Sequence, residues 1–385
     1  MKKIFHNKIF KNFKGVSGHV DGLFAILVIL LAAYGTATVF SAGFYYAETR
    51  YDDGYYFIKR QAIWLLLGIC AMAIASITDV TLFKKFTPAI YLCTLLLLIT
   101  VLIFGFVGNG AQRWISIGPI TVQPSEIAKI ALILALARYF EDNAERALNM
   151  RSKKTILLHG TLFPILIMLV PIVLVMLQKH LSCIIILGAI GLLMIVTSGA
   201  ALEFIYGFMG AGISGVAAIA LFTDYTKDRI TVWLNPEAHK LTGGWQTLQG
   251  LMAIGAGGLF GTGYGKSLLK HAYVSEPAND MIFTILCEEL GLIGGISVLI
   301  LFSLLIYRGF IIAMRTEGVF SRMLVLGILI KMAIQVLLNV AVVTNSIPNT
   351  GISLPFFSYG GSSLVMLFLE MGMVLSVSRN AKITK

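Results

Sequence analysis

The chain has 385 residues, of which 57% are hydrophobic and 13% charged, and its mean hydropathy is +0.86. Soluble domains carry about a quarter charged residues, so this composition excludes a soluble fold. A net charge of +11 often indicates nucleic acid, but here Lys and Arg stand in short segments between apolar stretches, and no basic run has interleaved aromatic residues. We therefore expect no nucleic-acid partner.

Ten stretches of about 20 mostly apolar residues follow one another along the chain. The first is too long for the core of a signal peptide, so we expect it to remain as an anchor. The fourth begins with charged side chains, which must face protein or water. The expected spans lie near 22–42, 61–78, 87–107, 125–140, 155–177, 181–199, 201–223, 281–306, 320–343 and 353–378. The sequence predicts an all-α integral membrane protein with ten transmembrane helices.

The distribution of Lys and Arg predicts the orientation. If the N-terminus is cytoplasmic, 18 of the 30 basic residues fall inside, 10 fall outside and two lie within spans. Cytoplasmic loops carry the excess of Lys and Arg in membrane proteins. We therefore expect the basic N-terminal segment 1–20 and the C-terminal segment 379–385 to be cytoplasmic. The whole chain, 1–385, is predicted to form a single transmembrane domain.

The longest connection, residues 224–280, falls on the extracytoplasmic side between the seventh and eighth predicted helices. It is too long for a structureless loop in a compact protein. Leu248, Leu251 and Met252 repeat at helical spacing beside Trp245. This pattern predicts a short helix in the membrane interface, with an aromatic anchor.

Charged side chains at membrane depth cost about 2.5–3.5 kcal/mol each on insertion scales, so their presence needs a reason. Arg113 stands outside, shortly before Pro124, Glu126 and Lys129. Pro124 predicts a helix start, with Glu126 near the positive end of the helix. Two roles for Glu126 and Lys129 stay open: a cap with an internal ion pair, or direct contact with a ligand.

A second charged group surrounds Asp280, at the outer mouth of the eighth predicted span. Glu288 follows eight residues later and therefore lies about 12 Å deeper on a helix. The outer position of Asp280 suits a catalytic role, and the deeper position of Glu288 suits a structural role. Asp is also a good N-cap, and position alone favours that role for Asp280. Both alternatives remain open on the residues alone.

The C-terminal spans carry a third polar group. Ser358 stands in the run 354–363, where Gly360 and Gly361 favour close packing of helices. Lys331 and Glu370, on the last two predicted spans, are expected to neutralise one another.

At these three groups the chain resembles the SEDS family, the FtsW, RodA and SpoVE proteins of cell division, elongation and spore formation. The resemblance covers nearly the whole chain, and Lys266, Ser267 and Lys270 make it more similar to the FtsW and SpoVE branch. It implies ten transmembrane helices and a glycosyltransferase of the bacterial cytoplasmic membrane. The implied substrate is Lipid II, the undecaprenyl-diphosphate-linked precursor, polymerised on the outer face in division or in spore cortex synthesis.

The resemblance also implies an essential Asp at the position of Asp280. The implied partners are a class B penicillin-binding transpeptidase and other membrane proteins of division or sporulation. Two motifs depart from the family. The segment Gln-Pro-Asp-Leu-Gly appears here with His180 in place of its Asp, so no acidic role transfers to that position. Ala278 stands where the family has a His before the essential Asp, so Asp280 lacks that partner.

Chain growth requires the C4 hydroxyl of one precursor to displace undecaprenyl diphosphate from the anomeric carbon of another sugar chain. A carboxylate can accept the hydroxyl proton, and cations can stabilise the leaving diphosphate. Asp280 is the expected base, or else the ligand of a divalent cation such as Mg²⁺ or Mn²⁺; no other cofactor is indicated. The expected substrate-binding residues are Arg113, Glu126, Lys129, Arg229, Lys270, Glu288 and Ser358.

Two other functions would use the same features. A flippase for the lipid-linked precursor needs cations and intramembrane charges along its path. A non-catalytic scaffold for the class B penicillin-binding protein needs only the membrane fold.

Overall fold

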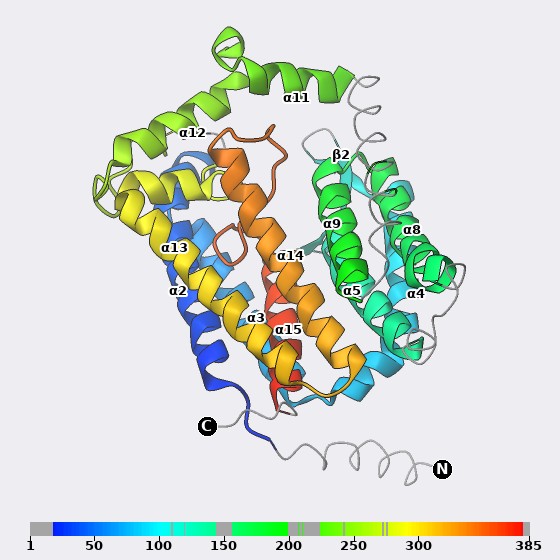
Figure 1. Cartoon of the computed structure of the whole chain (residues 1–385). Coiled ribbons are helices and arrows are strands. Elements are labelled where there is room, and N and C mark those ends of the chain that lie inside the picture. Colours follow the sequence, from blue (N-terminus) through cyan, green and yellow to red (C-terminus); the bar gives the residue numbers. More distant parts are fainter. Residues whose placement is uncertain are drawn as a thin grey trace.

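The computed structural model describes residues 18–379, with gaps at 109–110, 119, 144–155, 199–206, 208–209, 211–223, 242, 272 and 275. Long helices form a bundle, and shorter elements gather at one of its ends (Figure 1). The long helices are α2 (Gly22–Tyr51), α3 (Tyr56–Ile77), α4 (Val80–Phe104), α5 (Pro124–Asp142), α8 (Phe163–Leu177), α9 (Leu181–Thr197), α13 (Ile282–Arg315), α14 (Val319–Val343) and α15 (Gly361–Ser378). A π-helical turn, η1 (Ile156–Leu162), leads into α8.

Nine of the ten predicted spans thus coincide with helices among the described residues. Seven of these helices are long and apolar enough to cross a membrane: α2, α3, α4, α8 with part of η1, α13, α14 and α15. Helix α9 is apolar but has 17 residues. The predicted span 201–223 lies, apart from residues 207 and 210, outside the described part of the chain. The number ten therefore stays a prediction.

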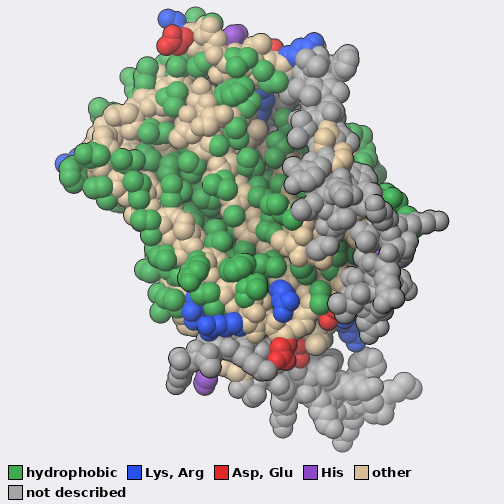
Figure 2. Space-filling model, in the orientation of Figure 1, with side chains coloured by type: hydrophobic (Ala, Val, Ile, Leu, Met, Phe, Trp, Pro, Cys, Tyr) green, Lys and Arg blue, Asp and Glu red, His purple; other side chains and the backbone are tan. Residues whose placement is uncertain are grey.

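The bundle has an apolar middle. On the face shown in Figure 2, hydrophobic side chains cover most of the described surface between the two ends, and charged side chains concentrate near the ends. Leu66, Ile74 and Phe104, for example, are 65%, 63% and 78% exposed. A membrane protein shows such a surface because lipid, rather than water, surrounds its helices.

The start of α2 and the end of α15 lie at the same end of the bundle (Figure 1). The Asp21 side chain caps α2 by accepting a hydrogen bond from Phe24 N at 2.9 Å. The Asp21 backbone N–H donates to Ser378 Oγ at 3.0 Å, and its carboxylate pairs with Arg308 at 2.8 Å. These contacts join α2, α13 and α15 at this end.

The opposite end carries the long connection, which has its own structure as predicted. It contains α11 (Asp224–Leu234), a 3₁₀ turn η2 (Glu237–His239) and α12 (Gly244–Gly257). Helix α12 confirms the short helix predicted from the leucine spacing. Trp245 Nε1 donates to the Tyr273 carbonyl oxygen at 2.8 Å, and Met252 is 57% exposed.

Two expectations need correction. The all-α class misses a three-stranded antiparallel sheet of β1 (Phe106–Gly108), β2 (Ala111–Ile117) and β3 (Ile120–Val122), in that order. Strands β1 and β3 have three residues each, and the seven residues of β2 do not alternate strictly between apolar and polar side chains, so the sequence pattern did not separate these strands from a loop. The last span was expected from residue 353, but α15 begins at Gly361. Pro355 and the positive φ of Phe356 (64°) keep residues 353–360 out of a helix.

Close packing of α15 on α3 depends on the absence of a side chain at Gly372. A Cβ there would lie 2.5 Å from the Met72 carbonyl oxygen, whereas a Cβ at Gly188 of α9 would meet nothing within 4 Å. We expect Gly372→Ala to destabilise the protein by about 1–3 kcal/mol through overpacking. Gly188→Ala, the matched control, should leave stability unchanged or raise it by about 0.5–1 kcal/mol. Thermal unfolding of both variants in detergent checks this, and equal melting temperatures would contradict the packing.

Candidate functional site

A cavity of about 500 Å³ opens among the loops at the end that carries α11 and α12. It brings together residues that are far apart in the sequence, from α3, β2, α5, the loop before α13 and the loop before α15. Five of the eight site residues expected from the sequence line it: Arg113, Glu126, Lys129, Arg229 and Asp280.

Asp280 does not act as a helix cap. Helix α13 begins at Ile282, its N-cap residue is Met281, and no side chain caps it. The Oδ1 atom of Asp280 is buried and has no hydrogen-bond partner among the described residues. The capping alternative therefore loses its structural basis, and an unsatisfied carboxylate oxygen remains at the cavity wall.

The pKa of Asp280 is raised to about 6, mainly by burial and to a smaller extent by the neighbouring Glu276 carboxylate. Backbone N–H groups of Asp280 and Met281, together with Arg229, act in the opposite direction. A carboxyl group with a pKa near 6 is largely ionised at pH 7, yet it accepts a proton more readily than an ordinary aspartate.

The loop that carries Asp280 is tied to the loop before α15. Asn339 of α14 donates through Nδ2 to the carbonyl oxygens of Asp280 (2.9 Å) and Ile352 (2.7 Å). Ser358 donates to the Asn279 carbonyl oxygen at 2.8 Å, and the Tyr359 N–H donates to Ala278 at 2.8 Å. These bonds place Asp280 beside Gly351, where a Cβ would lie 3.6 Å from Asp280 Oδ2.

Arginines from different elements reach the same cavity. Arg113 lies on β2, and its guanidinium donates to the Lys179 carbonyl oxygen. Arg229 of α11 donates to the Asn349 carbonyl oxygen. Arg60 of α3 also lines the cavity, and its guanidinium lies 4.4 Å from the centre of the Tyr56 ring. Sequence reasoning did not select Arg60, although a basic residue at the outer end of a predicted span was a usable signal.

Two ion pairs lie in or near the site, of which Glu126–Lys129 lines the cavity. Lys129 Nζ lies 2.7 Å from Glu126 Oε1, and Lys331 Nζ lies 2.5 Å from Glu370 Oε1. The second pair confirms the expected neutralisation. Lys331 also acts electrostatically on Glu126, so the two pairs form one neutral group on α5, α14 and α15.

His180 lies between α8 and α9 in the sequence. It is buried and lines the cavity. The pKa of His180 is lowered to about 3, mainly by burial and to a smaller extent by the Arg113 charge. The imidazole is therefore neutral at physiological pH. It replaces the Asp of the family motif with an uncharged group.

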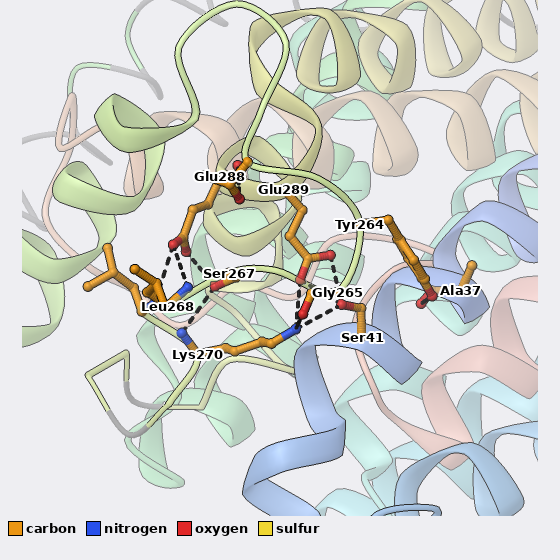
Figure 3. A network of polar contacts seen from close by, with 11 residues as sticks. Ala37, Ser41, Tyr264, Gly265, Ser267, Leu268, Lys270, Glu288 and Glu289 are labelled. Carbon is orange, nitrogen blue, oxygen red and sulfur yellow. Dashed lines mark hydrogen bonds and ion pairs between the residues drawn. The ribbon is translucent and has the colours of Figure 1, made fainter.

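Three expected binding residues occupy other places. Lys270 and Glu288 do not line the cavity; both are buried in a separate polar cluster (Figure 3). Glu288 accepts hydrogen bonds from Ser267 Oγ and Leu268 N, which fits the structural role that its depth suggested. Ser358 lines a small adjoining pocket of about 20 Å³, and its hydroxyl is engaged with the backbone. We therefore leave these three out of the substrate contacts proposed below.

A divalent cation has limited protein ligands here. The described residues contain no group of three or more His, Cys, Asp or Glu side chains arranged to hold a metal. Asp280 and Glu276 nevertheless both line the cavity. Mg²⁺ commonly binds through one or two carboxylates plus substrate phosphates, so these two residues fit a cation that arrives with a diphosphate.

The sequence matches a known family over most of its length. A sequence model of the FtsW, RodA and SpoVE cell cycle proteins matches residues 21–383. The chain belongs to this family. Within it, the chain is 37% identical to stage V sporulation protein E of Bacillus subtilis over 365 residues, which covers 94% of this chain and 98% of that protein. It is 33% identical to the probable peptidoglycan glycosyltransferase FtsW of Geobacter sp. (strain M18), covering 93% and 96%.

Solved structures of this family show the same fold. A chain from a structure described as "Structural coordination of polymerization and crosslinking by a peptidoglycan synthase complex" matches with a TM-score of 0.78 and 26% identity, covering 94% of this chain and 98% of that one. The rod shape determining protein RodA of Thermus thermophilus matches with a TM-score of 0.69 and 26% identity, covering 95% and 98%.

Mutation of the Glu126–Lys129 pair distinguishes its two possible roles, a structural ion pair and direct contact with a ligand. Lys129→Met leaves a buried carboxylate without its partner and should destabilise the protein by about 3–5 kcal/mol. The double variant Glu126→Gln/Lys129→Met removes both charges and should recover most of this loss. Chemical denaturation in detergent measures both. If the recovered double variant still binds a diphosphate lipid with wild-type affinity, the pair is structural only.

Proposed function

We propose that this protein polymerises Lipid II into glycan strands on the outer face of the bacterial cytoplasmic membrane. One observation carries the proposal: a buried carboxylate that caps no helix lies in the same cavity as three arginines. General-base catalysis needs the first, and a diphosphate leaving group needs the second. The 33% identity to proteins named probable peptidoglycan glycosyltransferase supports the same reaction.

In the proposed reaction, the C4 hydroxyl oxygen of the acceptor sugar forms a bond to the anomeric carbon of the donor chain. The bond from that carbon to the diphosphate oxygen breaks, and undecaprenyl diphosphate leaves. Asp280 accepts the hydroxyl proton as the new bond forms. The position of Asp280 on the cavity wall supports this role.

Arg113 and Arg229 would bind the diphosphate, and Arg60 is a third cation on the same cavity. Guanidinium groups pair well with phosphate oxygens because their donors lie in a planar fork. A hydrogen bond to a backbone carbonyl fixes the direction of Arg113 and of Arg229. A divalent cation held by Asp280 and Glu276 would add positive charge at the diphosphate; the steps above do not depend on it.

We also propose the orientation and the partner. The end with the termini would face the cytoplasm, which places the cavity and residues 224–280 outside, where Lipid II is polymerised. A class B penicillin-binding transpeptidase would act with this protein, because a similar chain belongs to a complex that joins polymerization to crosslinking. The identity to a sporulation protein favours division or spore cortex synthesis as the process.

Asp280→Asn separates the catalytic role from every structural role. Asn has nearly the same shape, so the fold and transpeptidase binding should stay near wild type. Loss of a general base should lower the polymerisation rate by about 10² to 10⁴. The measurement uses purified protein with its transpeptidase and labelled Lipid II, and gel electrophoresis of the glycan.

The same preparation, reconstituted in vesicles, distinguishes the other candidate functions. Labelled lipid that crosses the membrane without strand formation would indicate a flippase, and neither activity would indicate a scaffold. Long strands made by Asp280→Asn at the wild-type rate would rule out Asp280 as the base.

The raised pKa of Asp280 predicts the pH dependence. The base must be ionised, so kcat/KM should fall about tenfold per pH unit below pH about 6 and level off above it. Glu276→Gln removes a neighbouring negative charge that helps to raise this pKa, so its acid limb should move to lower pH. A rate that does not change between pH 5 and pH 7 would contradict the assignment.

The raised pKa of Asp280 also affects the stability of the fold, and as pH falls stability changes in the opposite direction to activity. The folded protein binds a proton at Asp280 that the unfolded chain releases, so this contribution is present below pH about 4 and is lost as pH rises through about 6. Because this contribution to stability is present at acid pH, its loss cannot explain a fall in activity there.

Cysteine labelling tests the orientation. A membrane-impermeant reagent should label Lys240→Cys in intact cells, because Lys240 is exposed at the α12 end. Lys85→Cys, exposed at the opposite end near the start of α4, should be labelled only after permeabilisation. The protein without an added cysteine provides the background. The reverse pattern would invert the orientation and place the cavity in the cytoplasm.

A further inference from the structure

A second group of buried charges lies outside the cavity, between the loop after α12 and the first turns of α13 (Figure 3). Lys270 Nζ lies 2.8 Å from Glu289 Oε1, and the two side chains are 6% and 3% exposed. Ser41 of α2 donates to the same carboxylate, with its Oγ 2.6 and 2.7 Å from the two oxygens. A buried ion pair rarely stabilises a fold more than apolar residues would, so another role is worth testing.

Helix α13 is divided where this group contacts it. Gly291 has φ 66° and ψ −167°, which interrupts the helix after residue 290. The loop after α12 satisfies the interrupted backbone: Thr262 N and Gly263 N donate to the carbonyl oxygens of Glu288 and Glu289, each at 2.9 Å. The first segment of α13, residues 282–290, is therefore joined to this loop by bonds that a continuous helix would make internally.

Helix α12 packs against the same first segment. A Cβ at Gly250 would lie 2.5 Å from Met281 Cε, and one at Gly257 would lie 1.9 Å from the Cys287 carbonyl oxygen. Helix α12, the loop and residues 282–290 thus form one closely packed unit. Asp280 stands directly before its helical segment, so a movement of the unit moves the proposed base.

Polar side chains of the described residues connect this unit to α2 at a few positions, one of which is the contact between the His271 and Tyr45 rings, whose centroids lie 4.2 Å apart. Besides the Ser41 contact, the Tyr264 hydroxyl donates to the Ala37 carbonyl oxygen at 2.7 Å. Ala37 and Ser41 are four residues apart and so lie on one face of α2. Glu288 accepts hydrogen bonds from the backbone N–H groups of Leu268 (2.8 Å) and Leu269 (3.3 Å), which places Lys270 over Glu289.

We propose that Lys270, Glu289 and Ser41 form a polar pin that fixes the first segment of α13 to α2 and thereby positions Asp280 for proton transfer. The pin residues touch no substrate and act through Asp280 alone. This inference rests on the proposed function, because Asp280 is the group that the pin positions.

The pin is tested by removing both charges together. The double variant Lys270→Met/Glu289→Gln leaves no unpaired buried charge, and its Gln can still accept from Ser41. We expect kcat to fall about 10- to 100-fold, since a misplacement of about 1 Å can cost 10²-fold. KM should stay within a factor of about two, because the diphosphate contacts lie on other elements.

Two matched variants show whether the effect is specific. Lys270→Arg keeps the charge and should retain activity within a factor of about three. Arg308→Gln breaks the pair with Asp21, which also joins α13 to α2 but lies beyond the interruption at Gly291. This variant should keep the wild-type kcat and pH profile. A loss in Arg308→Gln as large as that in the double variant would overturn the pin.

Wild type and Asp280→Asn in the same assay keep the two proposals apart. If wild type makes strands and Asp280→Asn does not, an unchanged kcat in the folded double variant overturns the pin and leaves the function in place. If Asp280→Asn is fully active, the base assignment fails and the pin's catalytic role fails with it. Amide exchange then tests the mechanical part: faster exchange in the double variant confined to residues 282–290 supports the pin, and unchanged rates contradict it.

Discussion

A lipid bilayer offers no water to a polar group, so every charge within this bundle must find a partner or a wet cavity. The described residues follow this constraint in two ways. Three pairs satisfy one another in the interior: Glu126 with Lys129, Lys331 with Glu370, and Lys270 with Glu289. Asp280, by contrast, keeps a buried carboxylate oxygen without a partner at a cavity wall. Glu370 also has a buried oxygen without a hydrogen-bond partner, but its carboxylate is paired with Lys331, whereas Asp280 lines the cavity where chemistry is expected.

The architecture around the cavity follows from the same constraint. Irregular backbone is tolerated at membrane depth only where protein or a water-filled cavity surrounds it. The segments before α13 and before α15 are irregular and bond to each other through Ser358, Tyr359 and Asn339. They bring Asp280 to the cavity that the arginines of three other elements reach. Helices and strands therefore supply the arginines of the site, and the loops between them supply Asp280.

Hydropathy was sufficient to locate most of the helices, because a stretch of about 20 consecutive apolar residues in a membrane protein has few conformations other than a transmembrane helix. It could not locate the sheet that carries Arg113, since β1 and β3 have three residues each. It also placed the start of the last span eight residues too early, because residues 353–360 are apolar and yet irregular. Hydrophobicity records what lipid accepts, not which backbone conformation a segment adopts.

Charge at membrane depth was an equally informative signal for the site, but only for residues that the fold brings together. Asp280, Arg113 and Glu126 were selected as charges that needed a reason, and they meet in one cavity. Lys270 and Glu288 satisfied the same criterion and instead hold the loop after α12, because the interruption at Gly291 brings that loop against α13. Whether a buried charge contacts substrate or supports its neighbours depends on long-range contacts, which one sequence does not reveal.

The central claim is that the carboxylate and the arginines of this cavity act on one lipid-linked substrate. A structure of the protein bound to a Lipid II analogue that cannot react would test it most directly. In that complex, we expect the diphosphate to contact the guanidinium groups of Arg113 and Arg229, and a sugar hydroxyl to lie within hydrogen-bonding distance of the Asp280 carboxylate. A diphosphate bound outside this cavity, with Asp280 remote from every sugar hydroxyl, would contradict it.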